Sequence, residues 1–216
     1  MDDWAQLQRF MAKWHRPLEP KDGLSEEQIA QIETTIGEKL PEQIHCFCSL
    51  VGNCLEEFES QDAWVLPLDW KVDSKRRIEI VVENQHVVSW WVHLGEGEQN
   101  NPPVWVEDEE NSATFSQFVL GRFAYETLFV GDTLCNNGAC SPTVIEEINR
   151  SYYEIVASYR RPSFPTRFYE SDELLVVTNH PQLGDSYGWI WVVAKPEHQQ
   201  TFDRFIENFS SVDWIG

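Results

Sequence analysis

Acidic side chains are the groups in this sequence best placed to do chemistry, and many of them gather in two short stretches. The first stretch consists of Glu56, Glu57, Glu59 and Asp62. The second consists of Glu96, Glu98, Glu107, Asp108, Glu109 and Glu110. Closely spaced carboxylates can form a binding face for a basic partner, or they can lie in loops that simply face water. Both interpretations stay open, and these residues are our candidates for contact with a partner.

Cysteine and histidine could supply a metal site or a catalytic nucleophile. The five cysteines are Cys46, Cys48, Cys54, Cys135 and Cys140. Zinc sites favour two matched pairs of closely spaced cysteines, and this spacing lacks the second pair. An odd and irregular set is also a poor disulfide framework. Cys140 and His180 could act as nucleophile and base only if folding brought them together, which nothing in the sequence predicts.

No established catalytic motif is present, since the sequence lacks GxSxG, HExxH and GxxxxGKS patterns. We therefore expect no catalytic residues, no cofactor and no metal. Trp90 and Trp91 are adjacent on a predicted strand, so one side chain points inward and the other outward. The outward one, for which we take Trp91, could anchor a partner because tryptophan is frequent at binding hot spots. Alternatively, both faces of the strand are covered.

The net charge of −20 excludes whole classes of partner. Nucleic-acid backbones and anionic membrane surfaces are bound through Lys and Arg, which are scarce here. A strongly acidic surface suits a basic protein partner, or it serves solubility alone. The chain begins without a signal-peptide pattern and has no apolar run of membrane-spanning length, so we expect a cytoplasmic protein.

The periodicity of apolar residues predicts an α+β fold. Helices are expected over residues 2–16, 25–37, 41–52 and 114–129, and strands over 63–68, 78–82, 87–94 and 104–106. Residues 131–141 are expected to form a loop or linker. Beyond it, we expect a helix from Pro142 that carries Ile155 on its apolar face, strands over 174–178 and 189–193, and a last helix over 196–209. Grouped strands between helices favour a mainly antiparallel sheet in a single domain, 1–216.

The stretch Leu24–Asn53 resembles the amino-terminal signature of the SUKH superfamily. That signature is an acidic and apolar helix with a central Glu, a Leu-Pro pair, and a second helix that ends at a Gly/Asn turn. The matching residues are Ile29, Ile32, Glu33, Gly37, Leu40, Pro41, Phe47, Gly52 and Asn53. The turn reads Gly52-Asn53 where the family usually has Asn-Gly. Residues 101–106 and 114–123 are similar to the family's later strand and closing helix, so the resemblance covers 22–130 and leaves 142–216 as a carboxy-terminal extension.

The resemblance implies binding without catalysis. Bacterial SUKH proteins are regarded as immunity proteins that neutralise toxins, often nucleases, while fungal relatives act as scaffolds in cell-wall synthesis and signalling. A nuclease toxin is basic where it holds phosphates, so an acidic partner could be steered to that cleft and block it. The expected partner is thus a basic toxin domain, and the alternative is an intracellular scaffold or regulatory protein with no toxin.

Overall fold

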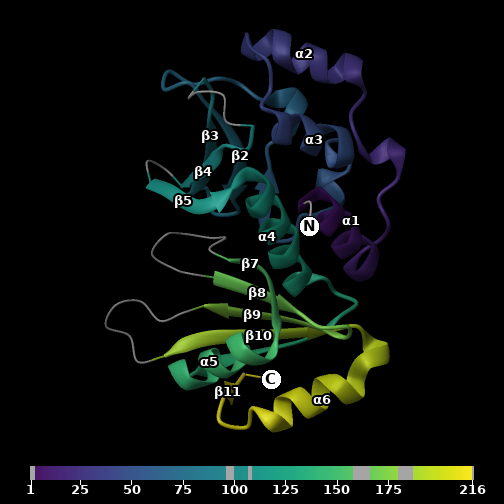
Figure 1. Cartoon of the computed structure of the whole chain (residues 1–216), viewed down its shortest axis with the longest axis vertical. Helices are drawn as coiled ribbons and strands as arrows, with labels where there is room; N and C mark the ends of the chain where they lie inside the picture. The colour runs from purple at the N-terminus through teal and green to yellow at the C-terminus, as the bar shows by residue number, and fades with distance from the viewer. Residues whose placement is uncertain (1–2, 96–99, 107–108, 158–165, 180–186, 216) are drawn as a thin grey trace. The chain divides into compact units, whose positions relative to one another are not determined.

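The chain divides into two compact units, Met1–Glu126 and Thr127–Gly216. The structure is a computed structural model that describes residues 3–95, 100–106, 109–157, 166–179 and 187–215. Each unit joins helices to its own antiparallel sheet (Figure 1), which confirms the predicted α+β class. We expected a single domain, 1–216, and the structure separates into these two units between Glu126 and Thr127. Among the described residues, no helix is both long and apolar enough to cross a bilayer.

Three α-helices open the first unit, as predicted. Their bounds are Asp3–Trp14 for α1, Glu26–Ile36 for α2 and Glu42–Val51 for α3, with a short 3-10 helix, η1, at Pro20–Asp22. A capping box begins α2, because Ser25 Oγ accepts from the Gln28 N–H at 3.3 Å and Gln28 Oε1 accepts from the Ser25 N–H at 2.9 Å. Gly37 ends α2 in a left-handed conformation, φ 83°, which glycine adopts without strain.

Glu33 fixes the turn between α2 and α3. Its Oε1 accepts from the Leu40 N–H at 3.1 Å, and its Oε2 accepts from Lys39 Nζ at 2.5 Å. Burial by itself would raise the pKa of Glu33, but the two hydrogen bonds outweigh burial and the pKa is lowered. The carboxylate therefore stays ionised and holds the chain in place at the point where it turns into α3.

A five-stranded sheet, in the order β1-β2-β3-β4-β5, packs beside these helices (Figure 1). Its strands are Asp62–Trp64 (β1), Arg77–Glu83 (β2), Ser89–His93 (β3), Pro103–Val106 (β4) and Glu109–Thr114 (β5), and the 3-10 helices η2 (Leu55–Phe58) and η3 (Pro67–Asp69) flank β1. β2 and β3, at the strands predicted over 78–82 and 87–94, pair as an antiparallel hairpin. Side chains alternate along β3 and β4, so Trp90, Val92 and Val104 are buried while Trp91 and Trp105 are only half-buried.

Helix α4, Phe115–Glu126, lies in the core of the first unit and continues into η4, Thr127–Phe129. Nearly all of its residues are buried. The Phe47 ring lies between aromatic neighbours, with its centroid 5.2 Å from that of Trp64 and 5.4 Å from that of Phe115. A helix buried on most sides has no simple apolar stripe, and this makes any charged residue on it structurally informative.

The second unit is a six-stranded sheet in the order β11-β6-β10-β9-β8-β7. Its strands are Leu134–Cys140 (β6), Tyr153–Ala157 (β7), Thr166–Glu170 (β8), Leu174–Asn179 (β9), Gly188–Ala194 (β10) and Asp213–Trp214 (β11). Its helices are α5 (Pro142–Ser151), α6 (Gln199–Asn208) and the short η5 (Pro196–His198). Both α-helices contribute to one buried cluster with the sheet, which includes Ile148 of α5, Phe205 of α6 and Val192 of β10.

Two predictions for the second unit are wrong. Residues 131–141 are not a linker, because Leu134–Cys140 is a strand that pairs with β10 on one side and with β11 on the other. The expected helix from Pro142 stops at Ser151, so Ile155 lies in β7. The strands at 174–178 and 189–193 and the final helix are confirmed by β9, β10 and α6.

Candidate partner-binding site

The first acidic stretch lies on η2 and on the turn that leads from it into β1. Glu56 and Glu57 are exposed, Glu59 is half-buried and Asp62 is only 3 % exposed. The structure thus brings four predicted residues to one short segment but gives them different surroundings. We call the two exposed residues, Glu56 and Glu57, the acidic rim.

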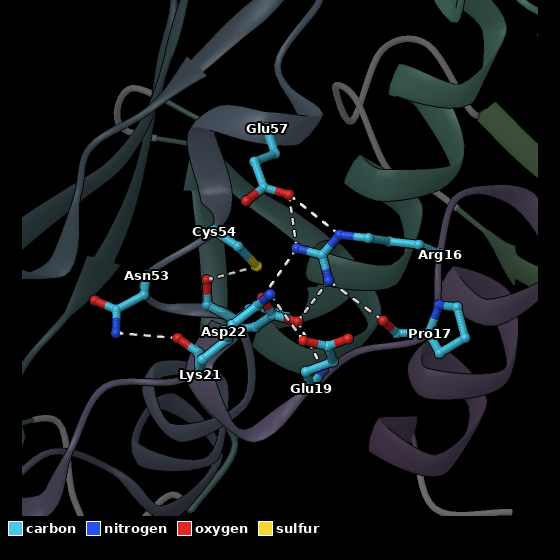
Figure 2. Close-up of polar contacts among 9 residues, drawn as sticks. Arg16, Pro17, Glu19, Lys21, Asp22, Asn53, Cys54 and Glu57 are labelled. Carbon is cyan, nitrogen blue, oxygen red and sulfur yellow. Dashed lines mark hydrogen bonds and ion pairs between the residues drawn. The ribbon is translucent and has the colours of Figure 1, made fainter.

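Arg16 holds one side of the acidic rim (Figure 2). Its Nη2 donates to Glu57 Oε2 at 2.6 Å, and its Nη1 donates to Asp22 Oδ2 at 2.6 Å. The guanidinium also lies over the Phe58 ring, 5.5 Å from its centroid. Glu57 stays more than half exposed in this pairing, so its carboxylate is fixed in direction and still meets solvent.

The buried carboxylate of Asp22 holds the Arg16 guanidinium in place. It is 2 % exposed, and it accepts from Arg16 through both carboxylate oxygens and from the Glu19 N–H at 2.7 Å. The hydrogen bonds from Arg16, with a smaller contribution from that N–H, lower the pKa of Asp22 even though burial opposes them. Two parallel N–H···O bonds between guanidinium and carboxylate define a single geometry, which a lone lysine would not.

The Gly52-Asn53 turn ties η1 to the end of α3. The Asn53 N–H donates to the Asp22 carbonyl at 2.8 Å, and Asn53 Nδ2 donates to the Gly23 carbonyl at 2.7 Å. A Cβ at Gly23 would lie 1.7 Å from the backbone oxygen of Ser49, so only glycine permits this approach. The segment that carries Asp22 is therefore locked onto α3, directly before η2.

The turn after the rim is held from the other side by two further carboxylates. Glu59 Oε1 accepts from the Trp64 N–H at 2.6 Å, and burial raises the pKa of Glu59. Glu126 Oε2 accepts from the backbone N–H groups of Ser60 and Gln61, at 2.5 and 2.8 Å. Glu59 thus stabilises the conformation of the turn, and we expect it to contribute little to the electrostatic attraction of a partner.

Asp62 is not a partner-binding residue, contrary to the prediction. Its carboxylate pairs with Arg122 Nη1 at 2.6 Å, and Arg122 Nη2 pairs with Glu126 Oε1 at 2.5 Å. The three side chains are 0–1 % exposed. A buried guanidinium on α4 must be neutralised by carboxylates, and Asp62 supplies one of them. The charge of Asp62 therefore belongs to the core of the unit.

The second acidic stretch can be assessed only in part. Glu96, Glu98, Glu107 and Asp108 lie outside the described residues. Glu109 is exposed at the start of β5. Glu110 pairs with Trp105 in the register of β4 and β5, so this part of the expected loop is a strand.

Trp91 lies on the outward face of β3, as predicted, and is half-buried. The Arg77 guanidinium stacks on its ring, 4.4 Å from the centroid, and Asp73 accepts from Arg77 Nε at 2.9 Å. Trp105, its neighbour in the register, is also half-buried on this face. The pairing of Trp91 with Trp105 follows from the register of β3 and β4, which the sequence alone did not give.

The cysteines do not gather into a reactive or metal-binding group in the described part of the chain. No cluster of three or more His, Cys, Asp and Glu residues suited to a metal ion occurs there. Burial raises the pKa of Cys54 to about 12 and that of Cys140 to about 11. At neutral pH both thiols are protonated and weakly nucleophilic. His180, the expected partner of Cys140, lies outside the described residues.

Sequence reasoning missed the residues that hold the site in place, namely Arg16, Asp22, Arg122 and Glu126. For Arg122 and for the contact of Arg16 with the rim, the separation explains this, since Arg122 and Asp62 are 60 residues apart and Arg16 and Glu57 are 41 apart. One signal was available. Arg122 lies in the apolar segment that forms α4, and a charged residue in such a segment is seldom buried unless it is paired.

Comparison with known proteins adds no relative to this description. No protein-family model matches the chain, and neither a curated protein nor a solved structure matches it.

Proposed function

We propose that this chain is a non-catalytic, SUKH-like immunity protein that binds a basic toxin and blocks it. The observation that carries the proposal is the acidic rim: Glu56 and Glu57 are exposed on a segment that Arg16 and Glu126 hold in one conformation. Glu57, fixed by Arg16, and the adjacent exposed Glu56 are suited to meet a positively charged surface.

The charge of the whole chain supports the same partner class. At −20, the protein attracts cations over distances of about a Debye length, roughly 8 Å at physiological salt. Such long-range attraction raises association rates by one to several orders of magnitude for partners of opposite charge. A toxin that cleaves nucleic acid is basic around its active site, so the acidic rim would approach the surface that its substrate needs.

The fixed geometry of the rim also supports binding. Ordering a flexible glutamate on binding costs about 0.5–1.5 kcal/mol per side chain. Glu57 is already held by Arg16, and the adjoining turn is held through Ser60 and Gln61. Much of this loss of conformational entropy therefore occurs during folding. The electrostatic attraction to a partner is then offset less on binding, and the affinity is higher.

The residues that resemble the SUKH signature have clear structural roles, which is consistent with the proposed family. Glu33 fixes the turn into α3 through Leu40, and Asn53 fastens η1 to the end of α3. Together these contacts position the segment from Asp22 to the acidic rim. Under this proposal, the signature residues stabilise the fold, and the acidic side chains that follow them determine which partner binds.

The test is a rescue assay in cells that express a toxin domain encoded beside this gene. Wild-type chain is compared with Glu56→Lys/Glu57→Lys and with Glu146→Lys/Glu147→Lys, a matched control. Glu146 and Glu147 are also adjacent and exposed, but they lie on α5 in the second unit. Both double variants change the net charge by the same amount, so they separate a local rim effect from a general loss of negative charge.

We expect rescue by wild type and by the control, and loss of rescue by the rim variant. In a binding assay with the purified toxin domain, the rim variant should associate at least tenfold more slowly, with a weaker dependence on salt. If every adjacent toxin domain kills cells that contain wild-type chain, the immunity proposal is wrong. The scaffold alternative would then take its place.

A further inference from the structure

The outward face of the first sheet carries a row of aromatic and charged side chains. Ile78, Trp90, Val92 and Val104 point into the core, so the residues between them point the other way. We call the outward residues Arg77, Glu79, Trp91, His93 and Trp105 the tryptophan face. They come from three adjacent strands, β2, β3 and β4; Arg77 is buried, and the other four are half-buried.

The register places the key residues side by side. Glu79 is opposite Trp91, and Trp91 is opposite Trp105. Directly opposed residues on one face of an antiparallel pair have Cβ atoms about 5 Å apart. A carboxylate and two indoles therefore lie in a line across the strands. Glu79, Trp91 and Trp105 are each half-buried, which leaves part of each side chain at the surface.

The chain already shows how a guanidinium binds at this face. Arg77 stacks on the Trp91 ring at 4.4 Å while Asp73 pairs with it at 2.9 Å. The positive charge of Arg77 is thereby balanced within the chain. Glu79 has no ion-pair partner among the residues that the structure describes, so its carboxylate gives the face a net negative charge. On the far side, the His93 ring lies 4.7 Å from that of Trp105.

We infer that the tryptophan face binds an arginine-bearing segment of a basic protein partner, with Trp91 and Trp105 as the apolar floor and Glu79 as the counter-ion. This inference rests on the proposed function and names a second surface through which the same partner would be held. The choice of arginine follows from the face itself. A planar guanidinium can stack on an indole and pair with a carboxylate at once, whereas a lysine ammonium stays more strongly hydrated.

The acidic rim and the tryptophan face should affect different rate constants of binding. The acidic rim offers carboxylates that act at a distance, and such charges mainly change association rates. The tryptophan face offers buried aromatic area, and tryptophan contacts at an interface mainly slow dissociation. A partner with basic residues but no arginine segment would be attracted and then released quickly.

The first experiment observes the tryptophan face directly in the full chain. The indole N–H signals are followed by ¹H–¹⁵N NMR, with those of Trp91 and Trp105 assigned from Trp→Phe variants. The probes are a (Gly-Arg)6 peptide, its lysine counterpart and its glutamate counterpart, all at physiological salt. We expect both indole signals to shift with the arginine peptide, to shift less with the lysine peptide at equal concentration, and to stay still with the glutamate peptide.

The second experiment measures affinity for the arginine peptide by calorimetry. Glu79→Gln and Trp105→Leu should each weaken binding about two- to fivefold. The matched controls are Glu146→Gln on α5 and Trp189→Leu on β10, which remove an exposed glutamate and a 40 % exposed tryptophan from the second unit. Thermal unfolding of each variant establishes that it is folded before its affinity is compared.

The inference is overturned if the arginine peptide binds while the two indole signals stay unchanged, or if the control variants lose as much affinity as Glu79→Gln and Trp105→Leu. It is also overturned if the rim variant Glu56→Lys/Glu57→Lys abolishes peptide binding by itself, since the peptide would then sit on the acidic rim. Indole shifts together with failed toxin rescue would support the tryptophan face as a surface for arginine while rejecting the immunity proposal.

Discussion

Removing the buried guanidinium of Arg122 should destabilise the first unit more than any surface substitution. In Arg122→Met, an unbranched apolar side chain replaces the guanidinium, and the carboxylates of Asp62 and Glu126 lose their shared cation. Both carboxylates are about 1 % exposed, so water cannot take the place of Arg122. The substitution therefore tests whether the charges are mutually dependent.

The expected magnitude follows from the contacts. Arg122 makes ion pairs of 2.6 and 2.5 Å and also donates to the Asp62 carbonyl at 2.5 Å. Breaking a buried ion pair by removing one partner costs about 3–5 kcal/mol. Glu126 keeps its hydrogen bonds from Ser60 and Gln61, which moderate the cost on its side. We expect a loss of about 3–4 kcal/mol in the free energy of unfolding.

The assay is urea denaturation of the full chain, followed by tryptophan fluorescence and by circular dichroism. The companion variant is Arg122→Met/Asp62→Leu, which also removes one of the stranded carboxylates. It should recover part of the lost stability, because apolar replacement of a buried ion pair is often close to neutral. A loss below about 1 kcal/mol in Arg122→Met, or a double variant less stable than the single one, would refute the reasoning.

Three further predictions concern the segment around the acidic rim. Gly23→Ala should destabilise severely, since its Cβ would meet a backbone oxygen at 1.7 Å, whereas Gly131→Ala, with nothing within 4 Å, should be nearly neutral in thermal unfolding. The pKa of Asp22 is lowered below its ordinary value of 3.8, so its stabilising effect is present above that value and is lost as the pH falls through the folded-state pKa. The stability gap between wild type and Asp22→Asn should therefore be largest near neutral pH and close in acid titrations below about pH 4; a constant gap would contradict this sign. Iodoacetamide at pH 8 should leave Cys48 and Cys54 unmodified in the native protein, because burial raises both thiol pKa values, and mass spectrometry should find them alkylated only after unfolding.

Local sequence signals were sufficient for much of the first unit. The capping pair at Ser25 and Gln28 and the left-handed Gly37 fixed both ends of α2 through contacts within a few residues. The apolar alternation around Trp90 likewise predicted a strand with one covered face. Such features depend on nearest neighbours along the chain, so one sequence contains them.

The rest depended on contacts between distant residues. Strand β6 contains Asn136-Asn137-Gly138, which are poor strand formers, and its pairing with β10 determines its conformation. Asp62 looked like a surface acid because its partner, Arg122, lies on a helix far along the sequence. Trp91 was placed correctly by alternation, but the stacking of Arg77 on it required the register of β2 and β3.

The division between the units constrains how the chain can be shortened. Glu126 is the last residue of the first unit, and its carboxylate is one of the two that balance Arg122. A fragment that stops even one residue earlier would leave the Arg122 guanidinium paired with Asp62 alone. It would also lose the hydrogen bonds that hold the turn at Ser60 and Gln61. Any attempt to produce the amino-terminal half on its own should therefore retain Glu126 and several residues after it.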